Sequence, residues 1–209
     1  VGHDEARVKA HAELADELGV RLLVATELAH EFARAALGNR AQVVDGLAVA
    51  AATYYGNDRL LALPGSQAAI QWLPALFPPV AVACLTPIYE EHPHAWERAG
   101  HKLRRLQNAS LARALAAATP IIVLCNPNNP TGRTLPAAEV LAAAVQLQRR
   151  GGWLIVDEAF GDPDPENSVT ALAGGPAAPN LIVLRSLGKF FGLAGARVGF
   201  VFGAPEKLA

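Results

Sequence analysis

The sequence predicts an α/β fold in which a mostly parallel sheet is covered by helices on both faces, giving a three-layer αβα domain. Apolar strand-like segments alternate with helical segments from about residue 59 onward, and this alternation is typical of parallel sheets. Several of the strands are apolar along their whole length, as expected for strands buried on both faces. The most distinctive polar clusters also follow directly after strands.

The composition is that of a globular protein with a large core. Of the 209 residues, 52% are hydrophobic and 18% are charged. The net charge is −1, with 18 basic and 19 acidic residues, and Lys and Arg form no run. This balance argues against a nucleic-acid-binding or anionic-membrane-binding surface.

Cysteine usage and hydropathy favour a cytoplasmic location. Cys84 and Cys125 lie in apolar strand-like runs, so we expect reduced core thiols rather than a disulfide framework. No apolar run reaches the length of a membrane span, and the N-terminus lacks the pattern of a signal peptide. We therefore expect a cytoplasmic protein without a membrane partner.

The first 53 residues are predicted to be mainly helical. Apolar residues recur at helical spacing over 3–18, 26–37 and 45–55, and residues 20–25 form a short strand-like run. We find no arrangement of side chains in the first fifty residues that indicates chemistry. We divide the chain into this segment, 1–53, and a large domain, 54–209.

The strand over 59–63 is followed by a glycine-bearing turn with Ser66 and Gln67, and then by a helix over 68–76. Such a turn directs free backbone N–H groups and the positive end of a helix dipole outward, which suits a phosphate group. The alternative is an ordinary connection with Ser66 as the helix N-cap, and this segment alone favours that alternative.

The next strand, over 80–85, leads to Tyr89, just past the carboxyl end, where open α/β sheets bind ligands. The helix after it carries His92 and His94. This pair could indicate a metal site, but no Cys or carboxylate cluster completes it in the sequence. We therefore expect two surface histidines and no bound metal.

The turn at residues 126–132 reads Asn-Pro-Asn-Asn-Pro-Thr-Gly. This turn follows a fully apolar strand over 120–125. That strand is preceded by a strand over 101–106 and a helix over 110–118. Two X-Pro steps and a glycine favour a rigid turn. It presents short amides, Asn129 among them, at the end of a parallel strand.

A helix over 135–150 and a strand over 153–156 precede two adjacent carboxylates, Asp157 and Glu158. Adjacent residues of an extended strand point to opposite faces of the sheet. Only one of the two can therefore face a ligand, and we expect the other to support it from behind. Residues 162–179 are predicted to form a loop with one weak helical turn.

The last polar cluster lies between strands over 181–184 and 198–202 and contains Ser186, Lys189 and Arg197. A lysine among Leu, Phe and Gly is expected to lose hydration, which favours a nucleophilic amine. The hydroxyl and the guanidinium suit a phosphate group. For Lys189 alone, the alternative is a loop lysine that reaches solvent.

These clusters are expected to meet. The carboxyl ends of parallel strands lie at one edge of the sheet, so Ser66, Gln67, Asn129, Asp157 and Lys189 should converge in an active site. A dinucleotide-binding domain is disfavoured, because no Gly-x-Gly-x-x-Gly follows any strand.

Three motifs closely resemble those of the fold-type I pyridoxal-phosphate enzymes, the aspartate aminotransferase superfamily (class I/II). They are the turn at 126–132, Asp-Glu-Ala-Phe at 157–160 and the Ser-x-x-Lys…Gly-x-Arg run at 186–197. Within the superfamily they look most like the L-threonine-O-3-phosphate decarboxylases of cobalamin biosynthesis. The related histidinol-phosphate aminotransferases usually have Tyr where Phe160 stands. The resemblance covers about residues 54–202 and implies the large domain of the PLP-dependent transferase fold.

The resemblance implies a role for each matching residue. Lys189 looks like the lysine that is linked covalently to pyridoxal 5'-phosphate, and Asp157 would pair with the pyridine nitrogen. Asn129 is similar to the asparagine that donates to the ring hydroxyl oxygen, and Tyr89 would stack on the ring. The residues expected around the cofactor phosphate are Ser66, Gln67, Ser186 and Arg197.

The reaction implied by the resemblance is decarboxylation of L-threonine O-3-phosphate to (R)-1-aminopropan-2-yl phosphate, with Lys189 and Asp157 as catalytic residues, in a homodimer. Two alternatives stay open: an aminotransferase of the histidinol-phosphate type, and a truncated cofactor-binding domain without turnover. Members of the family normally carry a C-terminal small domain with a substrate-binding arginine, which we expect to be absent from this chain. Residues 1–53 do not resemble the family's N-terminal segment.

Overall fold

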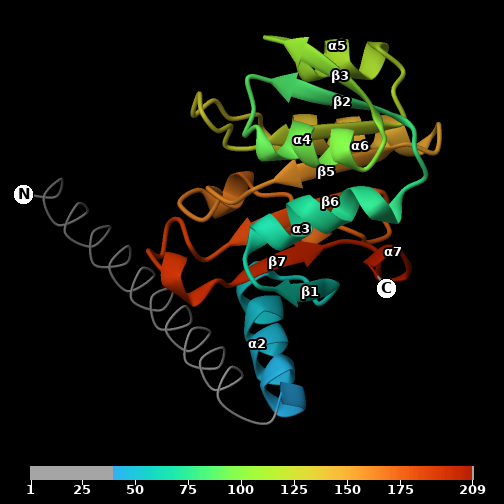
Figure 1. Ribbon diagram of the computed structural model, residues 1–209. Coiled ribbons are helices and arrows are strands. Elements are labelled where there is room, and N and C mark those ends of the chain that lie inside the picture. Colours follow the sequence, from blue (N-terminus) through green and yellow to red (C-terminus); the bar gives the residue numbers. More distant parts are fainter. Residues whose placement is uncertain (1–39, 209) are drawn as a thin grey trace, which may run out of the picture.

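The computed structural model describes residues 40–208 (Figure 1). The expected helices over 3–18 and 26–37 and the expected strand over 20–25 lie outside the described residues. The described chain forms one seven-stranded sheet with strand order β1-β7-β6-β5-β4-β2-β3. In Figure 1, β3 and β1 lie at opposite edges of the sheet, and α2 lies beside β1.

The strands predicted from residue 59 onward are confirmed to within two residues at each end. The strands are β1 (Leu60–Leu63), β2 (Ala81–Thr86), β3 (Lys102–Gln107), β4 (Ile121–Cys125), β5 (Trp153–Asp157), β6 (Leu181–Ser186) and β7 (Gly199–Phe202). The α-helices are α2 (Arg40–Tyr55), α3 (Ser66–Trp72), α4 (Glu91–Arg98), α5 (Leu111–Ala116), α6 (Ala137–Gln148) and α7 (Pro205–Leu208). Short 3₁₀ helices are η1 (Leu73–Leu76), η2 (Pro165–Asn167), η3 (Thr170–Leu172) and η4 (Ala194–Ala196).

The expected mostly parallel sheet is confirmed. Strands β3, β2, β4, β5 and β6 pair in parallel, whereas β7 is antiparallel to both β6 and β1. Because β7 runs in the opposite direction, its first residue, Gly199, lies at the same edge as the last residues of β1 and β6: it pairs with Leu63 and Ser186. This reversal brings the segment before β7 to the edge where the parallel strands end.

Side chains of the strands alternate between two hydrophobic cores, which confirms the three-layer arrangement. Residues such as Leu154 and Val156 pack with helices α2, α5 and α6 in one core. Their chain neighbour Ile155 packs with α3 and α4 in the other. The period of two in an extended strand explains this division, and fully buried strands explain the continuous apolar runs in the sequence.

Three local expectations differ from the structure. The N-cap of α3 is Gly65, with φ 85°, and not Ser66, which is the first helical residue. The predicted helix over 68–76 is divided into α3 and η1, with Pro74 in the first turn of η1, where its missing N–H is tolerated. The loop over 162–179 contains two 3₁₀ turns rather than one.

The two cysteines are free and buried, as predicted. Burial raises the pKa of the Cys84 thiol to about 12, so this thiol is neutral at physiological pH.

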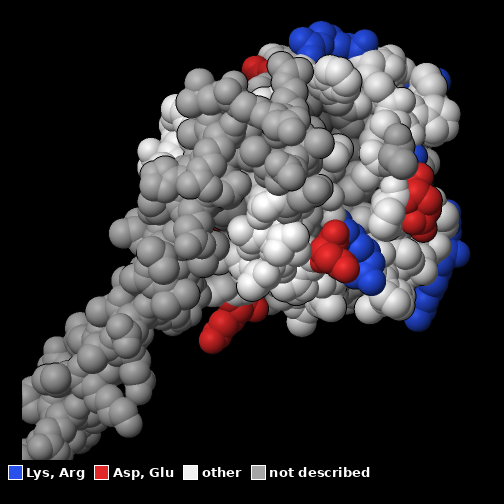
Figure 2. Space-filling model, turned by 90° about the horizontal axis from the view of Figure 1, so that it is seen from below, with Lys and Arg blue, Asp and Glu red and all other residues white. Residues whose placement is uncertain are grey.

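On the face shown in Figure 2, charged side chains stand in small separate groups of either sign among uncharged atoms. Within residues 40–208, no helix has the length and apolar character required to cross a membrane.

Gly199 allows β7 to approach the start of α3 closely. A Cβ on Gly199 would lie 2.3 Å from the Ser66 nitrogen and 2.6 Å from the Gly65 carbonyl carbon. We expect Gly199→Ala to reduce the free energy of unfolding by about 1–3 kcal/mol, because backbone must move. Urea unfolding measures this change.

Gly195→Ala is the matched control, because a Cβ there would meet nothing within 4 Å. Its effect should stay within about 0.5 kcal/mol. Equal unfolding midpoints for the two variants would contradict the close approach of β7 and α3.

Candidate active site

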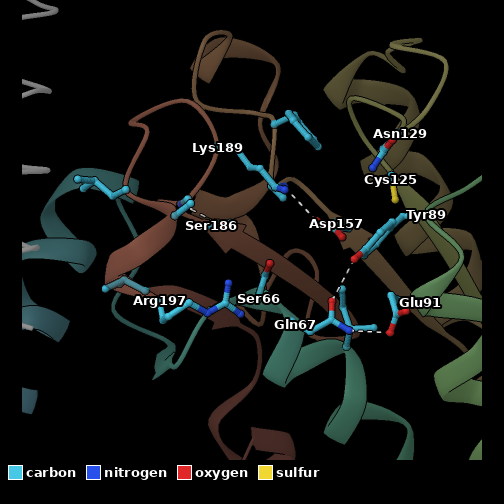
Figure 3. Close-up of a pocket in the computed structure, with 18 of the residues that line it drawn as sticks. Ser66, Gln67, Tyr89, Glu91, Cys125, Asn129, Asp157, Ser186, Lys189 and Arg197 are labelled. Carbon is cyan, nitrogen blue, oxygen red and sulfur yellow. Dashed lines mark hydrogen bonds between the residues drawn. The ribbon is translucent and has the colours of Figure 1, made fainter. Parts of the chain in front are cut away.

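A pocket of about 400 Å³ lies at the edge of the sheet where the parallel strands end (Figure 3). Its walls come from segments that are far apart in the sequence: the start of α3, the segment between β2 and α4, and the residues after β4, β5 and β6. The residues predicted to bind the cofactor all line this one pocket: Ser66, Gln67, Tyr89, Asn129, Asp157, Ser186, Lys189 and Arg197. The expected convergence is therefore present in the structure.

Asp157 is the buried carboxylate of the pocket, with 5% of its surface exposed. As the last residue of β5, it has the same parity as Ile155 and therefore points to the α3/α4 face. Its Oδ1 accepts a hydrogen bond from the Ala159 N–H at 2.9 Å, and its Oδ2 lies 2.8 Å from the His92 Nε2. Two partners in different directions fix the orientation of this carboxylate.

The surface-histidine expectation is wrong for His92 and right for His94. His92 is 1% exposed and contacts Asp157, whereas His94, two residues further along α4, is exposed. The expectation that no Cys or carboxylate lies beside the histidines is also wrong, because the ligand atoms of His92, Cys125 and Asp157 all lie within 4.8 Å of one another. Sequence spacing could not reveal this cluster, since its three residues come from α4, β4 and β5.

Lys189 lies in the loop after β6, and Figure 3 shows its amine reaching over the pocket. The expected loss of hydration is not present: Lys189 is exposed. The apolar neighbours in the sequence, such as Phe190, are themselves partly exposed and do not enclose the amine. The Lys189 Nζ lies over the ring of Phe160, 5.3 Å from its centroid.

Arg197, Ser66 and Ser186 lie together at one end of the pocket (Figure 3). The Arg197 backbone is left-handed, with φ 52°, and this sharp turn precedes β7. Its Nη2 lies 3.0 Å from the point where a Cβ on Gly65 would stand. A Cβ at position 65 would crowd the guanidinium, and this end of the pocket offers a cation, two hydroxyls and the first turn of α3.

The opposite end carries Tyr89, Asn129 and Cys125 (Figure 3). In the turn after β4, Asn126 is held by two bonds to Leu135, and the Asn128 side chain bonds Pro87 O and Thr131 Oγ1. These two amides fix the turn, while Asn129 lines the pocket. Burial, followed by the charge of Asp157, raises the pKa of the Cys125 thiol well above its usual value, so the thiol stays neutral beside the carboxylate.

Glu91 is a pocket residue that the sequence analysis missed. Its Oε2 accepts hydrogen bonds from the Gln67 Nε2 at 2.8 Å and from the Gln71 Nε2 at 2.9 Å. The Tyr89 hydroxyl donates to the Gln67 Oε1 at 3.4 Å. The Gln67 side chain is therefore bound to its neighbours in the pocket wall. Burial, then Glu91 and Asp157, raise the Tyr89 pKa, so this phenol keeps its proton.

Comparison with known proteins identifies the family. A model of the aminotransferase class I and II family matches residues 10–209. The chain belongs to this family. The resemblance inferred from the three motifs is thereby confirmed, and the match begins within the N-terminal segment, ahead of the predicted large domain.

Two curated relatives of this family are threonine-phosphate decarboxylases. The protein from Pseudomonas aeruginosa is 54% identical over 164 residues, which are 78% of this chain and 48% of the relative. The protein from a Sinorhizobium species is 47% identical over 171 residues, which are 80% of this chain and 50% of the relative. The chain thus spans about half the length of these relatives.

The solved structures confirm the PLP-dependent transferase fold. Histidinol-phosphate aminotransferase from Sinorhizobium meliloti, solved in complex with pyridoxal-5'-phosphate, superposes with a TM-score of 0.74 and 25% sequence identity. The match covers 87% of this chain and 53% of that protein.

His92→Leu should destabilise the fold, because it leaves the buried Asp157 Oδ2 without its partner. We expect the free energy of unfolding to fall by about 1–3 kcal/mol in urea unfolding. His94→Leu, an exposed position on the same helix, should change it by less than about 0.5 kcal/mol. Equal effects of the two variants would show that the His92–Asp157 contact contributes nothing.

Proposed function

We propose that this chain forms the cofactor-binding part of a pyridoxal-phosphate-dependent decarboxylase of L-threonine O-3-phosphate. The observation that carries the proposal is one pocket in which an exposed amine, a buried carboxylate and a guanidinium face the same space. The decarboxylase relatives at 54% and 47% identity support the choice of reaction.

The donor set fits the cofactor. Pyridoxal phosphate is a dianionic phosphate joined to a protonatable ring, and the pocket has an end of matching character for each. Arg197, with the hydroxyls of Ser66 and Ser186 and the start of α3, supplies positive charge and donors for a phosphate. The buried Asp157 supplies the negative charge that a ring nitrogen requires. Glycine at position 65 leaves the space that the guanidinium needs.

When bound, pyridoxal phosphate supplies a conjugated ring that accepts the electron pair of a bond broken at the substrate α-carbon. Asp157 would keep a proton on the ring nitrogen, and the His92 and Ala159 contacts hold its carboxylate in place for this purpose. Asn129 would donate to the ring oxygen, and Tyr89 would cover one ring face.

Lys189 would hold the cofactor through its amine and return a proton after bond cleavage. Its exposure in the loop after β6 leaves the amine free to move between these two tasks. The neutral Cys125 thiol adds no second negative charge beside Asp157. In this proposal one set of residues binds the cofactor phosphate, a second set binds its ring, and the Lys189 amine transfers the proton.

An aminotransferase is the second candidate. The supporting observation is the match to the histidinol-phosphate aminotransferase structure at a TM-score of 0.74. Phe160 disfavours it: aminotransferases of this type usually carry a tyrosine hydroxyl at this position, and here the pocket wall has an apolar ring. A truncated cofactor-binding domain without turnover is the third candidate.

We also propose a homodimer as the functional unit, with a small phosphorylated amino acid as substrate and a cytoplasmic location. The division of the chain at residue 53 remains a prediction.

The function is tested by incubating the chain with pyridoxal phosphate and L-threonine O-3-phosphate, and by measuring CO₂ and 1-aminopropan-2-yl phosphate. We expect both products, and no glutamate when 2-oxoglutarate and histidinol phosphate are supplied instead. Asp157→Asn is the control variant: it should retain bound cofactor and lower turnover by about 10²-fold or more. Amino transfer without CO₂ would favour the aminotransferase, and cofactor binding without either product would favour the truncated domain.

A further inference from the structure

A cluster of buried charges lies behind the pocket, on the opposite face of β5 and β6. The Arg185 guanidinium, 2% exposed, bridges two carboxylates: its Nη1 is 3.0 Å from the Glu158 Oε2, and its Nη2 is 2.5 Å from the Asp162 Oδ1. Both carboxylates are also buried. None of these three residues lines the pocket at the sheet edge.

Each of the two residues that connect the strands is the chain neighbour of a pocket residue. Glu158 follows Asp157, and Arg185 precedes Ser186. In the parallel register Asp157 pairs with Leu184, and the Glu158 N–H donates to the Leu184 carbonyl at 2.9 Å. Since adjacent residues point to opposite faces, the ion pair joins the two strands from behind at the level where Asp157 and Ser186 face the pocket.

The cluster is held in one geometry by many contacts. Glu158 accepts hydrogen bonds from the Ser168 and Thr170 hydroxyls and from the Val169 N–H, at 2.5, 2.8 and 2.9 Å. The Arg185 guanidinium lies 4.6 Å from the centre of the Tyr55 ring, whose hydroxyl donates to Asp162 at 3.3 Å. A planar guanidinium bridges two carboxylates in a fixed orientation, whereas a lysine ammonium on its flexible stem imposes no such geometry.

Stability alone does not explain these residues. Removing two carboxylates and a guanidinium from water is costly, and apolar side chains of similar volume at such positions are often as stabilising or more so. What the pairs provide is direction, because one planar guanidinium that donates to two fixed carboxylates restricts how Arg185 on β6 can lie relative to the segment after β5.

We propose that Arg185 is a positioning residue for the active site: by bridging Glu158 and Asp162 it fixes the relative positions of Asp157 on β5 and of the Ser186–Lys189 segment after β6. This inference rests on the proposed function, since it concerns how the pocket holds the pyridine nitrogen and the phosphate of the cofactor. Arg185 acts through its neighbours and touches no ligand.

Two variants disturb the bridge while the chain keeps its charge. Arg185→Lys retains the positive charge but replaces the planar fork by a point charge on a flexible stem, which does not fix the two carboxylates in one orientation. Gly161→Ala leaves all charges in place, but its Cβ would lie 2.6 Å from the Arg185 Nη1 and displace the guanidinium. The control is Asn180→Ala. The buried Asn180 precedes β6 at the opposite edge of the sheet and donates to the Ala144 and Gly152 carbonyls at 2.9 and 2.8 Å.

The experiment measures three quantities for the wild-type chain and each variant: the urea midpoint without cofactor, the dissociation constant for pyridoxal phosphate, and the pH midpoint of the visible band of the bound cofactor. We expect all three variants to lower the urea midpoint. Arg185→Lys and Gly161→Ala should in addition weaken binding about tenfold, the equivalent of one charge-assisted hydrogen bond, and shift the pH midpoint. Asn180→Ala should leave both cofactor readouts at the wild-type values.

Wild-type affinity and pH midpoint in both bridge variants would overturn the positioning role while leaving the proposed function intact. Equal changes of the cofactor readouts in Asn180→Ala would also overturn it, since general loss of stability would then explain them. A wild-type chain that does not bind pyridoxal phosphate would overturn the proposed function, and the positioning role with it.

Discussion

The structure depends on the parallel pairing of β5 with β6. This register sets Asp157 opposite Leu184, and the period of two in both strands then decides which residues face the pocket and which face the second core. Asp157 and Ser186 point to one side, and Glu158 and Arg185 to the other. A shift of one of the two strands by one residue would turn that strand's side chains to the opposite face, which would separate Glu158 from Arg185 and take Asp157 or Ser186 out of the pocket.

The other pocket walls are added to this pair of strands by topology. The turn after β4 and the segment between β2 and α4 arrive at the same edge because these strands are parallel. Antiparallel β7 returns the chain to that edge, which brings Arg197 beside Gly65 and Ser66. The cation end of the pocket therefore exists because one strand of the sheet is reversed.

The sequence predicted the features that follow from local period and turn chemistry: the strands, the αβα layers, and the placing of Asp157 and Glu158 on opposite faces of the sheet. It did not predict contacts between distant segments. His92 was expected at the surface, yet its helix packs it against Asp157, 65 residues away along the chain. Lys189 was expected to be dehydrated by its apolar neighbours. It lies instead in an exposed loop, where these neighbours do not enclose its amine. The roles assigned to the pocket residues come from the family resemblance and remain proposals.

The central claim is that Lys189 is the residue that holds pyridoxal phosphate in this pocket. The direct measurement is to add pyridoxal phosphate to the purified chain, record the visible spectrum, reduce with borohydride and map the labelled peptide. The account predicts a yellow protein with the reduced label on Lys189. A label on an exposed lysine outside the pocket, such as Lys102, or a colourless protein, would contradict it.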